Sequence, residues 1–267
     1  MGNPADRRRS SLRGHQALDE ARSALAPEPS IRYAYTQVMF SPSSKARLTE
    51  HDLDRFQGET LFDRIGRATC EAGCLPRKEL YEACEVARRV RRVFRGGRII
   101  DLAAGHGLLA QILLILDDSS PAAVAADTVL PASCARLHDT LARTWPRLRS
   151  RVTFVARSLD SIELYEGDVV VASHACGALT DLVIDRAIAA RARLAVLPCC
   201  HVLKANGQGA LRGWVDGTLA IDIMRVVTLE HNGYHVRTQT IPVTVTPKNR
   251  LLLAQPRWVK SDLETAT

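Results

Sequence analysis

The chain has 267 residues, of which 46% are hydrophobic, 24% are charged and only 5% are aromatic. This composition is ordinary for a globular protein, and the scarcity of aromatic residues predicts a core of aliphatic side chains. No run of about 18 apolar residues is present to cross a bilayer, and no apolar segment follows the arginines near the start, so we expect no membrane partner and no secretory signal. The seven cysteines then indicate a reducing compartment, and we expect a cytoplasmic location.

The formal net charge of +7 permits contact with a polyanion such as RNA but does not require it. Positive charge is concentrated in residues 85–98, EVARRVRRVFRGGR, which hold six arginines and one glutamate. Two interpretations are open for this segment, a solvated helix face or a surface that grips phosphates. RNA is therefore a possible partner, and the composition leaves the oligomeric state open.

The first part of the chain predicts a tail followed by helices. Residues 1–30 are rich in Arg, Ser, Ala and Pro without a sustained period, which predicts a mobile basic tail. A helical N-terminal extension is expected over 31–95. It contains helical material at 48–74, where Thr49 can cap a helix. It also contains a helix at 76–95, in which apolar residues recur every three or four positions.

From residue 96 the pattern changes to short apolar strands that alternate with helices, which predicts a parallel sheet covered on both faces. The last two strands follow one another too closely for another crossover, so one of them should run antiparallel. The fold class is α/β. The pattern resembles the Rossmann-like, seven-stranded methyltransferase sheet, with five parallel strands and a terminal antiparallel hairpin. We expect this domain over 96–258, with a last helix near 211–230 and a C-terminal tail at 259–267. The predicted strands are 98–103, 122–127, 151–156, 168–173, 193–198, 234–241 and 249–258.

The stretch IIDLAAGHGLLA, residues 99–110, joins the first strand to its helix and predicts a nucleotide-binding loop. Gly105 and Gly107 let the backbone approach a ligand, and the helix start offers free N–H groups. The same loop fits the G-x-G-x-x-A form of the dinucleotide fingerprint. Asp101 favours S-adenosylmethionine (SAM) instead, because a carboxylate attracts its sulfonium and ammonium groups and repels a pyrophosphate. Ala103 stands where a D-x-G-x-G-x-G loop has its first glycine.

Further cofactor contacts are expected where the next strands end. Asp127, at the end of the second strand, can accept hydrogen bonds from both ribose hydroxyls, although nicotinamide cofactors place an acid similarly. Ser158 and Asp160 follow the third strand, close to where an adenine would lie. Ser173 follows the fourth strand and completes the predicted cofactor-binding set.

Two motifs follow the fourth and fifth strands, SHACGALTD at 173–181 and LPCCH at 197–201. Together with DLAAGHG they resemble a SAM-dependent methyltransferase-like family marked by His-Ala-Cys-Gly, Leu-Thr-Asp and Pro-Cys-Cys-His, a group that includes a eukaryotic tRNA 2′-O-methyltransferase. The resemblance covers about residues 96–205 and implies SAM as cofactor and methyl transfer as activity. The zinc-finger segments of the tRNA enzyme have no counterpart here, so the acceptor stays open.

The cysteines and histidines of these motifs allow several interpretations. Zinc ligation is disfavoured because the short Cys-x2-4-Cys spacing is absent, so no metal is assigned. A disulfide between the neighbours Cys199 and Cys200 would be strained. Either cysteine could instead attack a pyrimidine ring as a thiolate. The preferred interpretation is a pocket lined by small, soft side chains in which His174, or else His201, orients or deprotonates the acceptor. Buried cysteines with a purely structural role are the remaining possibility.

We therefore expect a SAM-dependent methyltransferase with an unidentified acceptor. We also expect the helical N-terminal extension of the protein to cap the pocket. Two alternatives stay open. One is an RNA methyltransferase whose arginine-rich helix grips phosphates, and the other is a non-catalytic SAM-binding or interaction protein that kept the fold.

Overall fold

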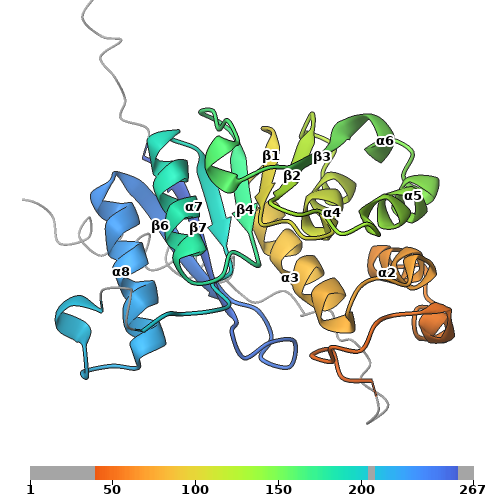
Figure 1. Cartoon of the computed structure of the whole chain (residues 1–267), viewed down its shortest axis with the longest axis horizontal. Helices are drawn as coiled ribbons and strands as arrows, with labels where there is room; N and C mark the ends of the chain where they lie inside the picture. Colours follow the sequence, from red (N-terminus) through yellow and green to blue (C-terminus); the bar gives the residue numbers. More distant parts are fainter. Residues whose placement is uncertain (1–39, 204–207, 258–267) are drawn as a thin grey trace, which may run out of the picture. The chain divides into compact units, whose positions relative to one another are not determined.

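Seven strands form one sheet within residues 40–203 and 208–257, the ranges that the computed structural model describes, in the order β3-β2-β1-β4-β5-β7-β6 (Figure 1). The expected tails at 1–30 and 259–267, and the first residues of the expected extension, lie outside these ranges. The described residues from Ser41 onward belong to one unit. The strands are β1 Ile99–Leu102, β2 Ala123–Asp127, β3 Val152–Ala156, β4 Val169–Ala172, β5 Arg193–Val196, β6 Tyr234–Thr240 and β7 Arg250–Pro256.

The strand directions confirm the expected fold class. β1 pairs in parallel with β2 and β4, and β3 and β5 extend the parallel sheet on either side. β7 runs antiparallel and lies between β5 and β6. The connection between β6 and β7 is too short to cross the sheet, so the chain turns back and pairs with the strand that it has just left.

The helices and 3-10 turns of the described residues largely follow the expected order. The helical material expected at 48–74 is divided into two elements, and Thr49 caps the 3-10 turn η1, where its N–H donates to Asp52 Oδ2 at 3.0 Å. The last helix begins at Gly217 rather than near residue 211, because Asp216 caps it by accepting from Leu219 N at 3.0 Å. The elements are η1 Glu50–Arg55, α2 Leu61–Ala72, α3 Arg77–Val93, α4 Leu108–Leu116, α5 Cys134–Thr144, α6 Leu148–Arg151, η2 Leu159–Ser161, α7 Ala178–Ala189, η3 Gly209–Leu211 and α8 Gly217–His231.

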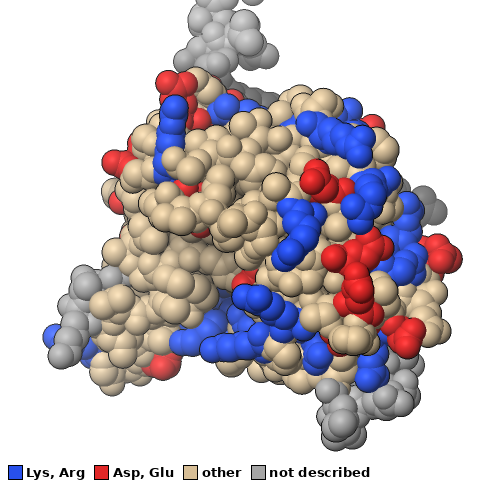
Figure 2. Space-filling view, turned by 45° about the vertical axis from the view of Figure 1, so that its right-hand side comes forward, with Lys and Arg blue, Asp and Glu red and all other residues tan. Residues whose placement is uncertain are grey.

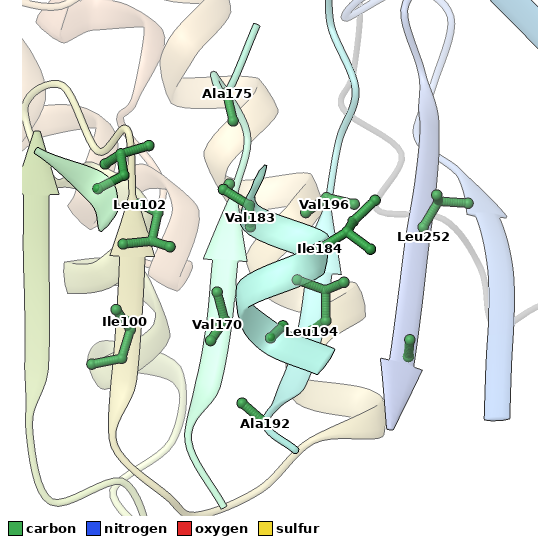
Figure 3. Close-up of a cluster of buried hydrophobic side chains, with 14 of the residues drawn as sticks. Ile100, Leu102, Val170, Ala175, Val183, Ile184, Ala192, Leu194, Val196 and Leu252 are labelled. Carbon is green, nitrogen blue, oxygen red and sulfur yellow. The ribbon is translucent and has the colours of Figure 1, made fainter. Parts of the chain in front are cut away.

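One face of the sheet packs against α7. This helix contacts β4, β5 and α8, and Figure 3 shows Val183 and Ile184 of α7 lying over side chains of the strands. The strand residues in this cluster include Val170, Leu194 and Val196, all of them buried. The cluster is aliphatic, as the low aromatic content predicted, and it holds the ends of β4 and β5 in a fixed position.

The helices α3 and α4 pack together, α4 also contacts β1 and β2, and α2 contacts α5. The described part of the expected extension therefore packs on helices of the sheet domain. Within the described ranges, every helix is too short or too polar to span a bilayer.

Arg91 of α3 is buried, which makes a solvated-face interpretation wrong for this arginine. Its Nε donates to Leu113 O at 3.0 Å and its Nη2 donates to Ser120 Oγ at 2.9 Å. Its Nη1 lies 3.3 Å from Asp117 Oδ2. Burial is the larger influence on the pKa of Arg91 and lowers it to about 10, while the Asp117 carboxylate opposes that shift. Arg91 therefore joins α3 to α4 inside the protein.

Other arginines of this segment are also paired with acids of the chain. Arg88 and Arg89 pair with Glu85 on the same helix, and Arg95 lies 3.4 Å from Asp117 Oδ1. Figure 2 shows basic and acidic side chains interleaved over the right-hand part of the visible face. Much of the positive charge is therefore balanced locally.

We expect Arg91→Ala to lower the free energy of unfolding by about 3 kcal/mol, because it leaves the buried Asp117 carboxylate with fewer partners. Urea denaturation followed by circular dichroism measures this change. The control is Arg92→Ala on the exposed side of the same helix, for which a change of about 0.5 kcal/mol or less is expected. Equal effects of the two substitutions would contradict the structural role of Arg91.

Candidate functional site

The residues expected to form the site follow strands that end at one edge of the sheet. Because β1 to β5 are parallel, the loops after them meet at that edge. The loop after β1 carries the glycines, and those after β4 and β5 carry the cysteine motifs. The structure therefore gathers residues that lie up to about a hundred positions apart in the sequence.

The glycine-rich loop has three residues in the left-handed region. Gly105 and Gly107 have φ of 53° and 67°, and Ala103 adopts φ of 59° although it carries a Cβ. The loop therefore keeps the bend that a glycine at the first position would favour. Strain of this kind costs about 1 kcal/mol and persists only where the surroundings impose it.

Gly105 and Gly107 have different roles. A Cβ at Gly105 would have no atom within 4 Å, so the space beside this residue is open to a ligand. A Cβ at Gly107 would lie 2.8 Å from Phe154 and 2.9 Å from Ala125. We had expected both glycines to make room for a ligand, but Gly107 allows the start of α4 to pack against β2 and β3.

Asp127 is joined directly to the glycine-rich loop. Its Oδ2 accepts a hydrogen bond from Gly105 N at 2.9 Å, and its Oδ1 accepts from Thr128 Oγ1 at 3.3 Å. Asp127 is half-buried, so its carboxylate keeps lone pairs for further donors. Binding of a ribose by Asp127 stays a prediction.

Asp101 lies within β1 rather than in the loop, and it is buried. Its Oδ2 accepts from Ala110 N in α4 at 3.2 Å. Burial raises the pKa of Asp101 to about 7, and the negative charge of Asp127 adds to this increase. The Ala110 hydrogen bond opposes the shift. A nearby positive charge would therefore bring Asp101 to its ionised form.

The remaining predicted cofactor residues lie at the same edge with different exposure. Ser173 is buried directly after β4. Ser158 and Asp160 are exposed at the turn η2 after β3, and a hydrogen bond from Ser158 lowers the pKa of Asp160. The hydrogen bonds of Ser158 and Asp160 lie within this turn. Contact of these two residues with a cofactor stays a prediction.

The three cysteines of the two motifs converge. Cys176 Sγ lies 3.0 Å from Cys199 Sγ, which is 3.8 Å from Cys200 Sγ, and the three sulfur atoms all lie within 4.8 Å of one another. Gly177 N donates to Cys200 O at 3.2 Å and joins the two loops. Burial, followed by the neighbouring thiols, raises the pKa of Cys199 strongly. A protonated thiol is a poor nucleophile, so this environment disfavours covalent attack by Cys199.

The two candidate histidines have different surroundings. His201 is almost fully buried, and its Nε2 lies 2.8 Å from Asp222 Oδ1 in α8. His174 is half-buried and interacts electrostatically with Glu79, in the first turn of α3. Burial raises the pKa of Glu79, and the charge of His174 opposes that shift. Of the two, His174 is better placed to reach an acceptor.

The sequence analysis missed a buried ionic network centred on Asp222. Arg225 Nη1 lies 3.1 Å from Asp222 Oδ1, and its Nε lies 2.7 Å from Asp181 Oδ1. Arg250 Nε donates to Asp222 Oδ2 at 2.7 Å. The network links His201 to α8 and β7. No local pattern signals it, because apart from Asp222 and Arg225 its paired members are more than 20 positions apart in the sequence.

A contact of His106 was also missed. Its Nε2 lies 2.9 Å from Ser133 Oγ at the start of α5. Burial lowers the pKa of His106, and the positive charges of Arg47 and Arg136 add to this effect. His106 therefore fixes the glycine-rich loop against the helix that follows β2.

Residues 77–206 match a family model described as a methyltransferase domain. A glutathione S-transferase C-terminal domain-containing protein from Xenopus laevis is 30% identical over a match that covers 32% of this chain and 20% of the relative. The matched part thus spans about a fifth of that protein's length.

Solved structures with a similar fold include an O-methyltransferase family protein from Burkholderia thailandensis, with 19% identity, a TM-score of 0.45 and coverage of 80% of this chain and 65% of the other. The tRNA methyltransferase TrmK of B. subtilis has 15% identity, a TM-score of 0.43 and coverage of 66% and 65%. Residues 77–206 are therefore similar to a methyltransferase domain, and the seven-stranded sheet with its antiparallel last strands agrees with that fold.

Proposed function

We propose that this protein transfers a methyl group from SAM to an acceptor, with the cofactor at the edge of the sheet where β1 and β2 end. The observation that carries the proposal is the contact of Asp127 with Gly105, which places a carboxylate beside a loop residue that is open to a ligand. SAM supplies a methyl group on a positively charged sulfur and contains no phosphate, so the two acids at this edge suit it better than they suit a dinucleotide.

The residues at this edge fit distinct parts of the cofactor. Asp127 accepts hydrogen bonds from the ribose hydroxyls, and the open side of Gly105 admits the nucleoside. Asp101, once ionised, provides negative charge for the amino-acid end of SAM. Ser173, which follows β4, offers a polar contact to the cofactor. Ser158 and Asp160 are proposed to contact the adenine.

His174 is proposed as the residue that orients the acceptor and takes its proton. It is half-buried at the same edge and interacts electrostatically with Glu79 of α3. The electrostatic interaction of Glu79 with His174 supports the proposal that the N-terminal extension caps the pocket. His201 is proposed to position the loop after β5, because Asp222 holds its ring inside the protein.

The acceptor is not defined by these residues. RNA was considered because of the arginines in 85–98, but several of these pair with acids of the chain, including Arg91 with Asp117 and Arg98 with Asp168. These pairs argue against a phosphate-binding surface over residues 85–98. We propose the cytoplasm as the location, where thiols such as those of the two motifs stay reduced.

Asp127→Ala is expected to weaken SAM binding at least tenfold, because charge-assisted hydrogen bonds to the ribose are lost, each of about 1.5–3 kcal/mol. Isothermal titration calorimetry measures the affinity. Asp139→Ala, which removes an exposed carboxylate from α5, is the matched control and should bind SAM normally. Normal binding by the Asp127 variant would refute the cofactor site.

SAM affinity is expected to rise by up to about 25-fold between pH 5.5 and pH 7.5. The pKa of Asp101 is raised to about 7 without ligand, so at low pH the cofactor must displace its proton, and this cost disappears as the pH rises. Calorimetry in buffers of different ionisation enthalpy reports the proton released. Asp101→Asn should bind weakly and show only the pH dependence of the ligand; an unchanged pH profile would contradict the role of Asp101.

His174→Ala is expected to lower the methyl transfer rate by about 100-fold or more while leaving SAM affinity within about twofold. Labelled methyl transfer into an extract from cells lacking the protein, followed by nuclease or protease digestion, measures the rate and identifies the acceptor class. If the wild-type protein binds SAM but labels no fraction, a non-catalytic SAM-binding function replaces this proposal.

A further inference from the structure

Three thiols meet outside the proposed cofactor contacts, although the sequence spacing argued against a metal site. Cys176 comes from the loop after β4, and Cys199 and Cys200 come from the loop after β5. β4 and β5 are neighbouring parallel strands, so both loops leave the sheet side by side. The absence of a short Cys-x2-4-Cys spacing therefore does not keep these ligands apart.

The three sulfur atoms lie close enough together to share one ion. Two thiolates bound to one zinc at about 2.3 Å and a tetrahedral angle lie about 3.8 Å apart. Here Cys199 and Cys200 are separated by this distance, 3.8 Å, whereas Cys176 and Cys199 are closer at 3.0 Å and would move apart slightly around an ion. All three atoms lie within 4.8 Å of one another. A disulfide needs only two of these thiols, so it leaves the third unexplained.

The exposure of these cysteines also differs from that of the others. Cys176 and Cys200 are exposed and Cys199 is half-buried, which leaves the cluster accessible to an ion from solvent. The remaining four cysteines are all buried, as is usual for free cysteines that serve as small apolar side chains. They are Cys70, Cys74, Cys84 and Cys134.

Hydrogen bonds within the protein hold both loops in place. Gly177 N donates to Cys200 O at 3.2 Å, and Arg225 Nη2 donates to Gly177 O at 3.3 Å. Thr180 Oγ1 donates to Ala175 O and closes the turn that carries Cys176. Ligands held in this way lose less conformational entropy when a metal binds.

We propose that Cys176, Cys199 and Cys200 bind one thiophilic d10 ion, with zinc as the first candidate, through three thiolates, and that a fourth position stays open to solvent. On binding, the three thiols release three protons to solvent, so a divalent ion leaves the site with one negative charge. Lys78 of α3 interacts electrostatically with Cys176 and offsets part of that charge. The site does not depend on methyl transfer or on SAM.

The test uses the full chain, purified under reducing conditions without a metal-binding tag. Mass spectrometric metal analysis should find about one zinc per chain. After removal of the zinc, Co²⁺ should bind with a thiolate-to-metal charge-transfer absorption whose intensity reports the number of thiolates. Single substitutions Cys176→Ser, Cys199→Ser and Cys200→Ser should each weaken Co²⁺ binding at least tenfold and lower this absorption.

Cys84→Ala is the matched control, because it removes a buried thiol of α3 and should keep both the zinc and the cobalt absorption. Circular dichroism of each variant verifies folding, and SAM calorimetry on the metal-free protein tests the cofactor site separately. Any of three results overturns the proposal: no zinc and no cobalt absorption with all thiols reduced, full metal affinity in the three Ser variants, or a Cys176–Cys199 disulfide in the protein as isolated.

Discussion

Five parallel strands that end at one edge of the sheet are the constraint on which the rest of this structure depends. Because β1 to β5 point the same way, every loop that follows them emerges on the same side. The glycine-rich loop, Asp127 and both cysteine motifs are brought together for this reason alone. The aliphatic cluster under α7 then fixes the ends of β4 and β5, so the two cysteine motifs that follow these strands start from rigid positions.

Charge at this edge is arranged so that a cation is favoured. Asp101 and Asp127 lie close enough that the charge of Asp127 raises the pKa of Asp101. Burial increases the free energy needed to ionise both carboxylates, and a positively charged ligand would offset that free energy. Gly105 N donates a hydrogen bond to Asp127, so one of these two carboxylates also holds the glycine-rich loop in its conformation.

The arginines and cysteines show why residue type alone does not reveal a role. Arg91 belongs to a sequence segment that looks like a polyanion-binding surface, yet its guanidinium is buried against Asp117 and backbone carbonyls. Cys84 and Cys176 are the same residue type, but one is buried within a helix and the other lies exposed beside two further thiols. The surroundings of each side chain determine what chemistry it can perform.

The sequence by itself determined the fold class, the strands, and the loops at which the site lies, because periodicity and glycine placement are local signals. Asp101, Gly105 and Asp127 were predicted as cofactor contacts on that basis, and the seven-stranded sheet confirms the predicted fold. Only the tertiary structure decided that Asp101 is buried, that Gly107 serves helix packing, that Asp222 joins His201 to two arginines, and that three thiols converge. Several of these contacts join residues more than 20 positions apart, such as Cys176 with Cys199 and His201 with Asp222, and long-range packing leaves no pattern within a short stretch of sequence.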